Sequence, residues 1–83
     1  MKPKYVRLFT KPSCPWCHEA IDWLHEHDIS FEELDVTNSA AARKEMIELT
    51  DQSRAPCIEV DGHILADFGT DELEPFLIKL GYN

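Results

Sequence analysis

The stretch Lys11-Pro12-Ser13-Cys14-Pro15-Trp16-Cys17 lies between two segments of different periodicity. Before it, residues 5–10 are rich in strand-forming residues, and Lys11-Pro12-Ser13 is a loop signal. After it, apolar residues recur at the spacing of one helix face, and these are Cys17, Ala20, Ile21 and Leu24. Pro15 suits the first turn of a helix, where its missing N–H is not needed. The two cysteines are therefore expected where a strand ends and a helix begins.

The same patterns predict the remaining elements. Residues 29–36 read as a second strand, and Asn38 or Ser39 can cap a second helix. A weaker apolar stripe follows in that helix, formed by Ala42, Met46, Leu49 and Thr50. Residues 57–60 and 63–66 read as short strands joined by Asp61-Gly62, a dipeptide typical of a two-residue hairpin turn. Thr70 begins a third helix, which Gly81 ends and whose apolar stripe is Leu73, Phe76, Leu77 and Leu80.

This order, β-α-β-α-β-β-α, indicates an α/β fold. The first strand–helix–strand unit should be parallel with a right-handed crossover. The hairpin should extend the same sheet in the antiparallel sense. We expect a four-stranded mixed sheet with helices on both faces, and a single domain covering residues 1–83, because a chain of this length has surface enough for only one core.

Composition excludes several classes of function. The formal net charge of −8 argues against nucleic acid or an anionic membrane as a partner. No apolar run approaches the roughly 20 residues that span a bilayer. The basic start of the chain is not followed by the apolar stretch of a signal peptide, so we expect a cytoplasmic protein. Cysteines in a reducing compartment are seldom a structural disulfide framework.

The Cys-x-x-Cys spacing has a chemical logic at the start of a helix. Free backbone N–H groups and the helix dipole favour an anion there, so Cys14 is expected to be the attacking thiolate. Cys17, one turn further on and on the buried stripe, is expected to resolve the mixed disulfide. Trp16 offers an apolar surface to a substrate beside the thiolate.

Other interpretations of the cysteines remain open. Cys14 to His18 also matches the short pattern for covalent haem attachment, although the predicted flanking strand and hairpin disagree with it. Cys14, Cys17, His18 and Cys57 could form a zinc site, although structural sites usually present two ligand pairs and Cys57 stands alone. We therefore expect no stable metal site. Cys57 itself is either a small buried hydrophobe or a third redox thiol.

Three segments carry a resemblance to the glutaredoxin family, which extends over nearly the whole chain. Residues 11–17 are similar to its dithiol active-site segment, Arg54-Ala55-Pro56 falls where the family has Thr-Val-Pro with a cis-proline, and residues 69–73 resemble the segment that opens its last helix. The resemblance implies a thioredoxin-like fold and a thiol–disulfide oxidoreductase that uses glutathione as cosubstrate, without a permanently bound cofactor. It also implies a monomer that acts on disulfide-containing proteins.

By this resemblance, glutathione would contact several elements around the cysteines. Lys11 would attract a carboxylate, and the backbone of Ala55, before Pro56, would pair with the tripeptide. Thr70 and Asp71 would hold the γ-glutamyl end at a helix N-terminus.

Two departures from the family pattern keep alternatives open. Arg54-Ala55-Pro56 is not Thr-Val-Pro, and Asp67-Phe68-Gly69 replaces paired glycines. These changes resemble the NrdH-type redoxins, which thioredoxin reductase reduces and which donate electrons to ribonucleotide reductase. A second alternative is a binding module that holds an iron–sulfur cluster between two chains, with glutathione as co-ligand.

Overall fold

The computed structural model describes residues 3–82 and contains one four-stranded sheet with three helices. The elements in chain order are β1 (Val6–Thr10), α1 (Pro15–Glu26), β2 (Glu32–Asp35), α2 (Ala40–Thr50), β3 (Cys57–Val60), β4 (His63–Ala66) and α3 (Thr70–Lys79). This order confirms the predicted β-α-β-α-β-β-α arrangement. Met1, Lys2 and Asn83 lie outside the described residues, so a single domain over 1–83 stays a prediction.

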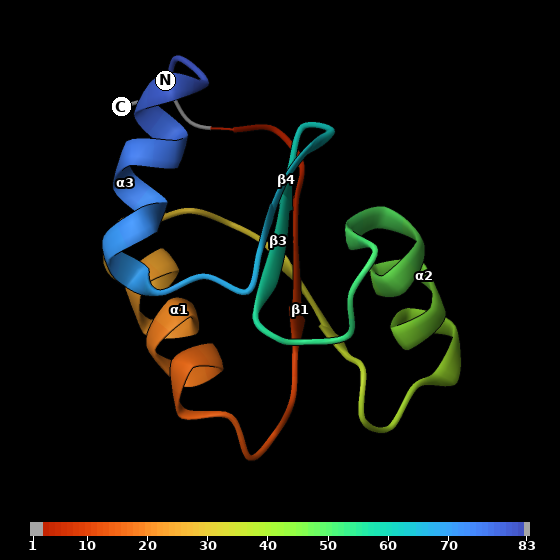
Figure 1. The fold of residues 1–83 in the computed structure, drawn as a ribbon. Coiled ribbons are helices and arrows are strands. Elements are labelled where there is room, and N and C mark those ends of the chain that lie inside the picture. Colours follow the sequence, from red (N-terminus) through yellow and green to blue (C-terminus); the bar gives the residue numbers. More distant parts are fainter. Residues whose placement is uncertain (1–2, 83) are drawn as a thin grey trace.

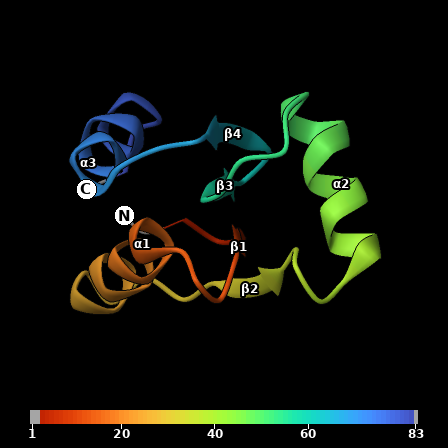
Figure 2. The same ribbon diagram turned by 60° about the horizontal axis from the view of Figure 1, so that its bottom comes forward.

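The sheet has the order β2-β1-β3-β4. β1 pairs with β2 in parallel and with β3 in antiparallel, and β3 pairs with β4 in antiparallel. Figures 1 and 2 show α1 and α3 on one face of the sheet and α2 on the other. The mixed sheet and the covering of both faces are therefore as predicted.

Local sequence explains where the elements begin and turn. The Ser39 Oγ accepts a hydrogen bond from the N–H of Ala42 at 3.1 Å and so caps α2. Asp61 and Gly62, which join β3 to β4, both have positive φ, at 47° and 91°. A type I′ turn needs positive φ at both central positions, and its twist matches that of the paired strands.

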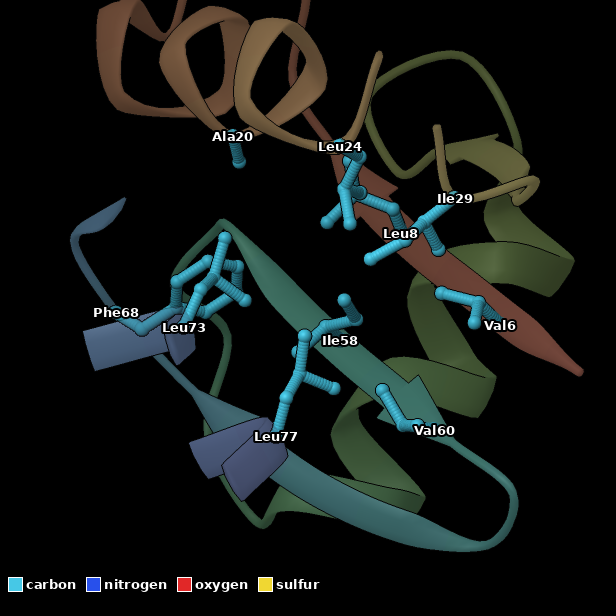
Figure 3. Close-up of a cluster of buried hydrophobic side chains, with 10 residues drawn as sticks. All are labelled: Val6, Leu8, Ala20, Leu24, Ile29, Ile58, Val60, Phe68, Leu73 and Leu77. Atoms are coloured by element: carbon cyan, nitrogen blue, oxygen red, sulfur yellow. The ribbon is translucent and has the colours of Figure 1, made fainter. Parts of the chain in front are cut away.

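The larger hydrophobic core lies between the sheet and the layer of α1 and α3 (Figure 3). Alternate residues of β1 and β3 face it, and α1 and α3 cover it with the apolar stripes expected from the sequence. Its fully buried members are Val6, Leu8, Ala20, Leu24, Ile29, Ile58, Val60, Phe68, Leu73 and Leu77. A smaller core under α2 contains Phe9, Val36, Ala42, Met46 and Cys57.

The structure corrects three details of the prediction. The second strand is shorter than residues 29–36, because Ile29 fills the core from the end of α1, where its N–H bonds to the Leu24 carbonyl at 3.0 Å. Leu49 was expected on the buried stripe of α2, but it is 38% exposed. Tyr5, expected in the first strand, precedes it and is also exposed. Ile29 is therefore buried without being part of the strand, whereas Leu49 and Tyr5 do not reach the core.

An ion cluster fixes α2 to the sheet. Arg7 of β1 is only 13% exposed and bonds through Nε to Glu59 of β3 and through Nη1 to Glu45 of α2, both at 2.7 Å. The two acids raise the pKa of Arg7 despite the opposing effect of its burial. Arg7 therefore stays charged and links three elements on the face opposite α1.

A second cluster ties the described chain ends to the β3–β4 turn. The Asp61 carboxylate accepts from the N–H of Tyr5 at 2.8 Å, from the N–H of Lys4 at 3.2 Å, and from the Tyr82 hydroxyl. The Tyr82 hydroxyl is the main reason why the pKa of Asp61 is lowered. None of the helices within residues 3–82 is long and apolar enough to cross a membrane.

Candidate active site

Cys14 is the residue that caps the N-terminus of α1. Its backbone is extended, its N–H bonds to the Lys11 carbonyl at 3.1 Å, and its Sγ accepts the N–H of Cys17 at 3.2 Å. The sulfur thus occupies the position where a helix presents unpaired N–H groups and its positive dipole end. The sequence assigns the attacking sulfur to this position, and that role of Cys14 stays a prediction.

Cys17 is fully buried beneath Cys14, on the core side of α1. Burial raises the pKa of Cys17 well above its ordinary value, and a hydrogen bond with Cys14 adds to the shift. Cys14 is partly exposed, and both thiols are free. One cysteine is therefore accessible at the start of α1, while the other is shielded and remains a thiol.

The Ala55–Pro56 segment lies directly beside Cys14. Its peptide bond is cis, as expected, and the Ala55 carbonyl oxygen is 3.9 Å from the Cys14 Sγ. The Pro56 carbonyl accepts the N–H of Phe68 at 3.4 Å, which brings the loop before α3 to the same place. The loops before α1, β3 and α3 therefore meet at one end of the sheet, toward the viewer in Figure 2.

The other expected binding residues lie on the loop before α1 or in the first turns of α1 and α3. Lys11 precedes Cys14, and Thr70 and Asp71 form the first turn of α3. Trp16, next to the buried Cys17, is 56% exposed. The structure brings these residues to one end of the molecule, and their contacts with a ligand stay predictions.

The loop before α3 also explains one departure from the glutaredoxin pattern. Asp67 has φ of 53°, a left-handed conformation that glycine adopts most readily and aspartate tolerates. Its carboxylate pairs with Arg54 at 3.2 Å. Two of the residues that depart from the family pattern, Arg54 and Asp67, are thus partners of each other.

Sequence reasoning missed two residues that hold the site. The Nε2 of His18 lies 2.8 Å from the Pro12 carbonyl and so fastens the loop before Cys14. Gln52 accepts the N–H of Arg54 at 2.6 Å and donates to the Arg54 carbonyl at 3.1 Å. Neither residue belongs to a periodic pattern. For Gln52, the sequence offered one signal: an amide side chain can bond to the backbone two residues further along a loop, here at Arg54.

The structure gives no support to a zinc site at the cysteines. Within residues 3–82, no group of three or more His, Cys, Asp or Glu side chains could hold a metal ion. His18 is directed to the Pro12 carbonyl, and Cys57 lies in the core under α2.

Comparisons with known proteins agree with this geometry. The glutaredoxin family model matches residues 6–65. The chain belongs to the glutaredoxin family. It is 37% identical over 68 residues to glutaredoxin 3 of Escherichia coli strain K12, and the matched residues cover 82% of this chain and 80% of that protein. It is 31% identical over 74 residues to a glutaredoxin-like 8.6 kDa protein in the rubredoxin operon of Clostridium pasteurianum, covering 89% and 99% of the two chains.

A solved structure has the same fold as this chain. A crystal structure of a thioredoxin-like protein matches with a TM-score of 0.80 and 30% identity, covering 87% of this chain and 99% of that one. The thioredoxin-like fold predicted from the sequence is therefore confirmed. As a member of the glutaredoxin family, the protein is a thiol–disulfide oxidoreductase that acts on disulfide substrates.

Proposed function

We propose that this glutaredoxin reduces protein disulfides and glutathione mixed disulfides through Cys14 and Cys17, and that glutathione returns the cysteines to the dithiol form. The observation that carries the proposal is the arrangement at the Cys14 Sγ. The sulfur accepts the Cys17 N–H at 3.2 Å and lies 3.9 Å from the Ala55 carbonyl, with Cys17 buried below it. A nucleophile, a resolving thiol and a backbone edge for a peptide therefore occur together.

The reaction proceeds by two successive thiol–disulfide exchanges. The Cys14 thiolate attacks one sulfur of the substrate disulfide, the S–S bond breaks, and the first substrate thiolate leaves and takes a proton from water. Cys17 then loses its proton and attacks the Cys14 sulfur, which releases the second substrate thiol and leaves a Cys14–Cys17 disulfide. Two glutathione molecules reverse these steps and leave as one glutathione disulfide.

The loops around Cys14 support glutathione as the reductant. The Lys11 ammonium would attract a carboxylate, the Ala55 backbone would pair with the tripeptide, and the first turn of α3 would receive the γ-glutamyl group. We infer that glutathione is a cosubstrate and that the active species is a monomer without a permanently bound cofactor. A cytoplasmic location remains the prediction from the sequence.

Paired NADPH assays test this function. The oxidised protein is supplied either with glutathione and glutathione reductase or with thioredoxin reductase, and turnover of a disulfide substrate is followed. We expect turnover with glutathione and its loss in Cys14→Ser. Cys17→Ser should lose reduction of protein disulfides and accumulate mixed disulfides at Cys14, yet keep activity on glutathione mixed disulfides. Turnover with thioredoxin reductase alone would contradict the glutathione proposal.

One observation favours an NrdH-type redoxin as the second candidate. Asp67 and Arg54 stand at positions that depart from the glutaredoxin pattern, and they form an ion pair at 3.2 Å beside Ala55. The Asp67 carboxylate also lies on the loop before α3, where a γ-glutamyl carboxylate would have to bind, and like charges repel. In this candidate, thioredoxin reductase supplies the electrons and ribonucleotide reductase receives them. The same paired assays decide between the candidates.

A third alternative is an iron–sulfur cluster held between two chains. It is tested by the visible absorbance and the molecular mass of protein purified without oxygen. A colourless monomer that is active in the disulfide assay would exclude it.

A further inference from the structure

Cys57, the third cysteine, lies at the junction of two loops that flank the active site. It is the first residue of β3, follows Pro56 directly, and is 1% exposed. Neither of the electron-transfer steps proposed above uses it. Its contacts, however, lead to the backbone on both sides of Cys14.

The loop before Pro56 is braced from inside by Cys57 and Gln52. The Cys57 thiol donates to the Arg54 carbonyl at 3.0 Å, and the same carbonyl accepts from the Gln52 Nε2 at 3.1 Å. Gln52 Nε2 also donates to the Cys57 Sγ at 3.1 Å, and Gln52 Oε1 accepts the Arg54 N–H at 2.6 Å. Both backbone groups of Arg54 are therefore fixed, and Arg54 is the residue next to Ala55.

The loop before α3 meets the same sulfur. β3 and β4 pair Cys57 with Ala66, the residue before Asp67, and the neighbouring Asp67 backbone acts to lower the pKa of the Cys57 thiol. Arg54 and Asp67 are also joined at the surface by their ion pair. The two loops are thus connected twice, in the interior by Cys57, which bonds to Arg54 through its thiol and pairs with Ala66 through its strand, and outside by two charged side chains.

The inner connection is the stronger of the two on physical grounds. The Arg54 side chain is 78% exposed, and exposed ion pairs contribute little because water and salt screen them. Cys57 and its partners are shielded, and buried polar groups that lose a partner are costly. Burial also raises the pKa of Cys57, so its sulfur remains a thiol that can donate, although the Asp67 N–H and Gln52 oppose the shift.

We propose that Cys57 is a positioning residue whose thiol, together with Gln52, holds the Ala55 backbone against Cys14 for pairing with an extended peptide, and that it takes no part in electron transfer. This proposal rests on the proposed role of the Ala55 edge in substrate binding. It assigns the third cysteine a hydrogen-bonding function. The substrate class it serves is a peptide that pairs through its backbone, whereas a small disulfide without a peptide backbone does not need it.

The test compares Cys57→Ser, which keeps a donor and an acceptor, with Cys57→Val, which fills the space without either. Each is assayed on a peptide disulfide, on the same peptide N-methylated at the amide facing Ala55, and on 2-hydroxyethyl disulfide. For the wild-type protein, N-methylation should raise KM by about three- to tenfold, the size of one hydrogen bond. Cys57→Ser should keep this ratio, and Cys57→Val should bring it close to one by weakening the unmodified peptide.

In single turnovers of the pre-reduced proteins without glutathione, the rate with 2-hydroxyethyl disulfide should be the same in all three proteins, because no peptide then meets the Ala55 edge. If Cys57→Val does not fold, Gln52→Met replaces it, because methionine keeps the length of glutamine and removes the bonds to Arg54. An N-methylation ratio in Cys57→Val, or in Gln52→Met, equal to that of the wild type would overturn the positioning role. Equal loss of activity in Cys57→Ser and Cys57→Val on every substrate, with Cys57 found in a disulfide by mass spectrometry, would show a redox thiol instead.

The wild-type result tests whether substrates use the Ala55 edge, and the variants test whether Cys57 positions it. If the wild-type protein itself does not respond to N-methylation, the Ala55 edge is not used and the proposed binding mode fails. If the wild type responds and the valine variant responds equally, only the role of Cys57 fails.

Discussion

Reaction with a chromogenic aryl disulfide separates the two cysteine steps into two phases of colour. Attack by Cys14 releases one coloured thiolate, and attack by Cys17 on the mixed disulfide releases the second. The rate of the second phase depends on the fraction of Cys17 present as thiolate. Changing the pH therefore measures how the surroundings of Cys17 affect its ionisation during catalysis.

The structure sets the magnitude of this pH dependence. Burial is the largest cause of the raised pKa of Cys17, and it persists in the mixed disulfide, whereas the contribution of the Cys14 thiol is removed when that sulfur is bonded. Below the pKa, the thiolate fraction grows about tenfold per pH unit, which corresponds to about 1.4 kcal/mol. An ordinary cysteine, with a pKa of about 8.5, would level off near pH 9. We expect the second phase to keep rising about tenfold per unit from pH 6 to pH 10.

Stopped-flow absorbance, with the protein limiting, records both phases. Cys17→Ser is the control that should lose the second phase entirely, and Cys57→Ser should retain it. Because the folded pKa of Cys17 lies above its unfolded value, its contribution to stability is complete below the unfolded pKa and is lost as pH rises through the folded pKa. Circular dichroism at each pH therefore verifies that the chain remains folded.

Two results would refute this reasoning. A second phase that levels off near pH 9, as for an ordinary cysteine, would mean that burial does not govern the ionisation of Cys17 in the mixed disulfide. A second phase that persists in Cys17→Ser would mean that another thiol resolves the intermediate.

Three further changes test the framework of the fold. Arg7→Met should lower the free energy of unfolding, measured in urea, by about 3 kcal/mol, because Glu59 loses its partner while largely buried. The double variant Arg7→Met with Glu59→Met should recover most of this loss, and no recovery would contradict this view of the pair. Ser39→Ala should cost about 1 kcal/mol in the same assay by removing the cap of α2, and a glycine there should cost less. The lowered pKa of Asp61 gives stability above the unfolded pKa of about 3.9 that disappears as pH falls through the folded pKa. The melting temperatures of Asp61→Asn and of the wild type should therefore converge at acidic pH, and those of Tyr82→Phe and the wild type should do the same. A difference in melting temperature that is constant from pH 6 to pH 2.5 would be inconsistent with this.

Periodicity and turn chemistry were sufficient to predict the order of elements. Asp61-Gly62 specified its hairpin because few residue pairs accept positive φ at both positions, and Pro15 and Ser39 marked helix starts by local chemistry. The boundaries of the second strand were wrong because an apolar residue such as Ile29 is buried in the same way whether its backbone is paired or not. Leu49 was misplaced because α2 contacts the sheet along a narrower line than its apolar residues suggest.

The candidate site was predictable where one short motif carries the chemistry. The positions of Cys14 and Cys17 follow from a strand, a turn and a helix start, which are all local. Gln52 and the junction at Cys57 were not predictable, because the sulfur meets the Asp67 backbone only after β3 and β4 have paired. Such contacts between side chain and backbone leave no periodic trace in a single sequence.

The cluster at Asp61 has a practical consequence for handling this glutaredoxin. It gathers Lys4, Tyr5 and Tyr82 at the β3–β4 turn, whereas Cys14 lies near the opposite end of β3, beside Pro56. An affinity tag, a fused partner or a linker to an electrode joined to the chain next to Lys4 or Tyr82 would start at the end of the sheet that lies away from the sulfur. The immobilised protein would then present its catalytic end to the solution, with the attachment at the other end of the sheet.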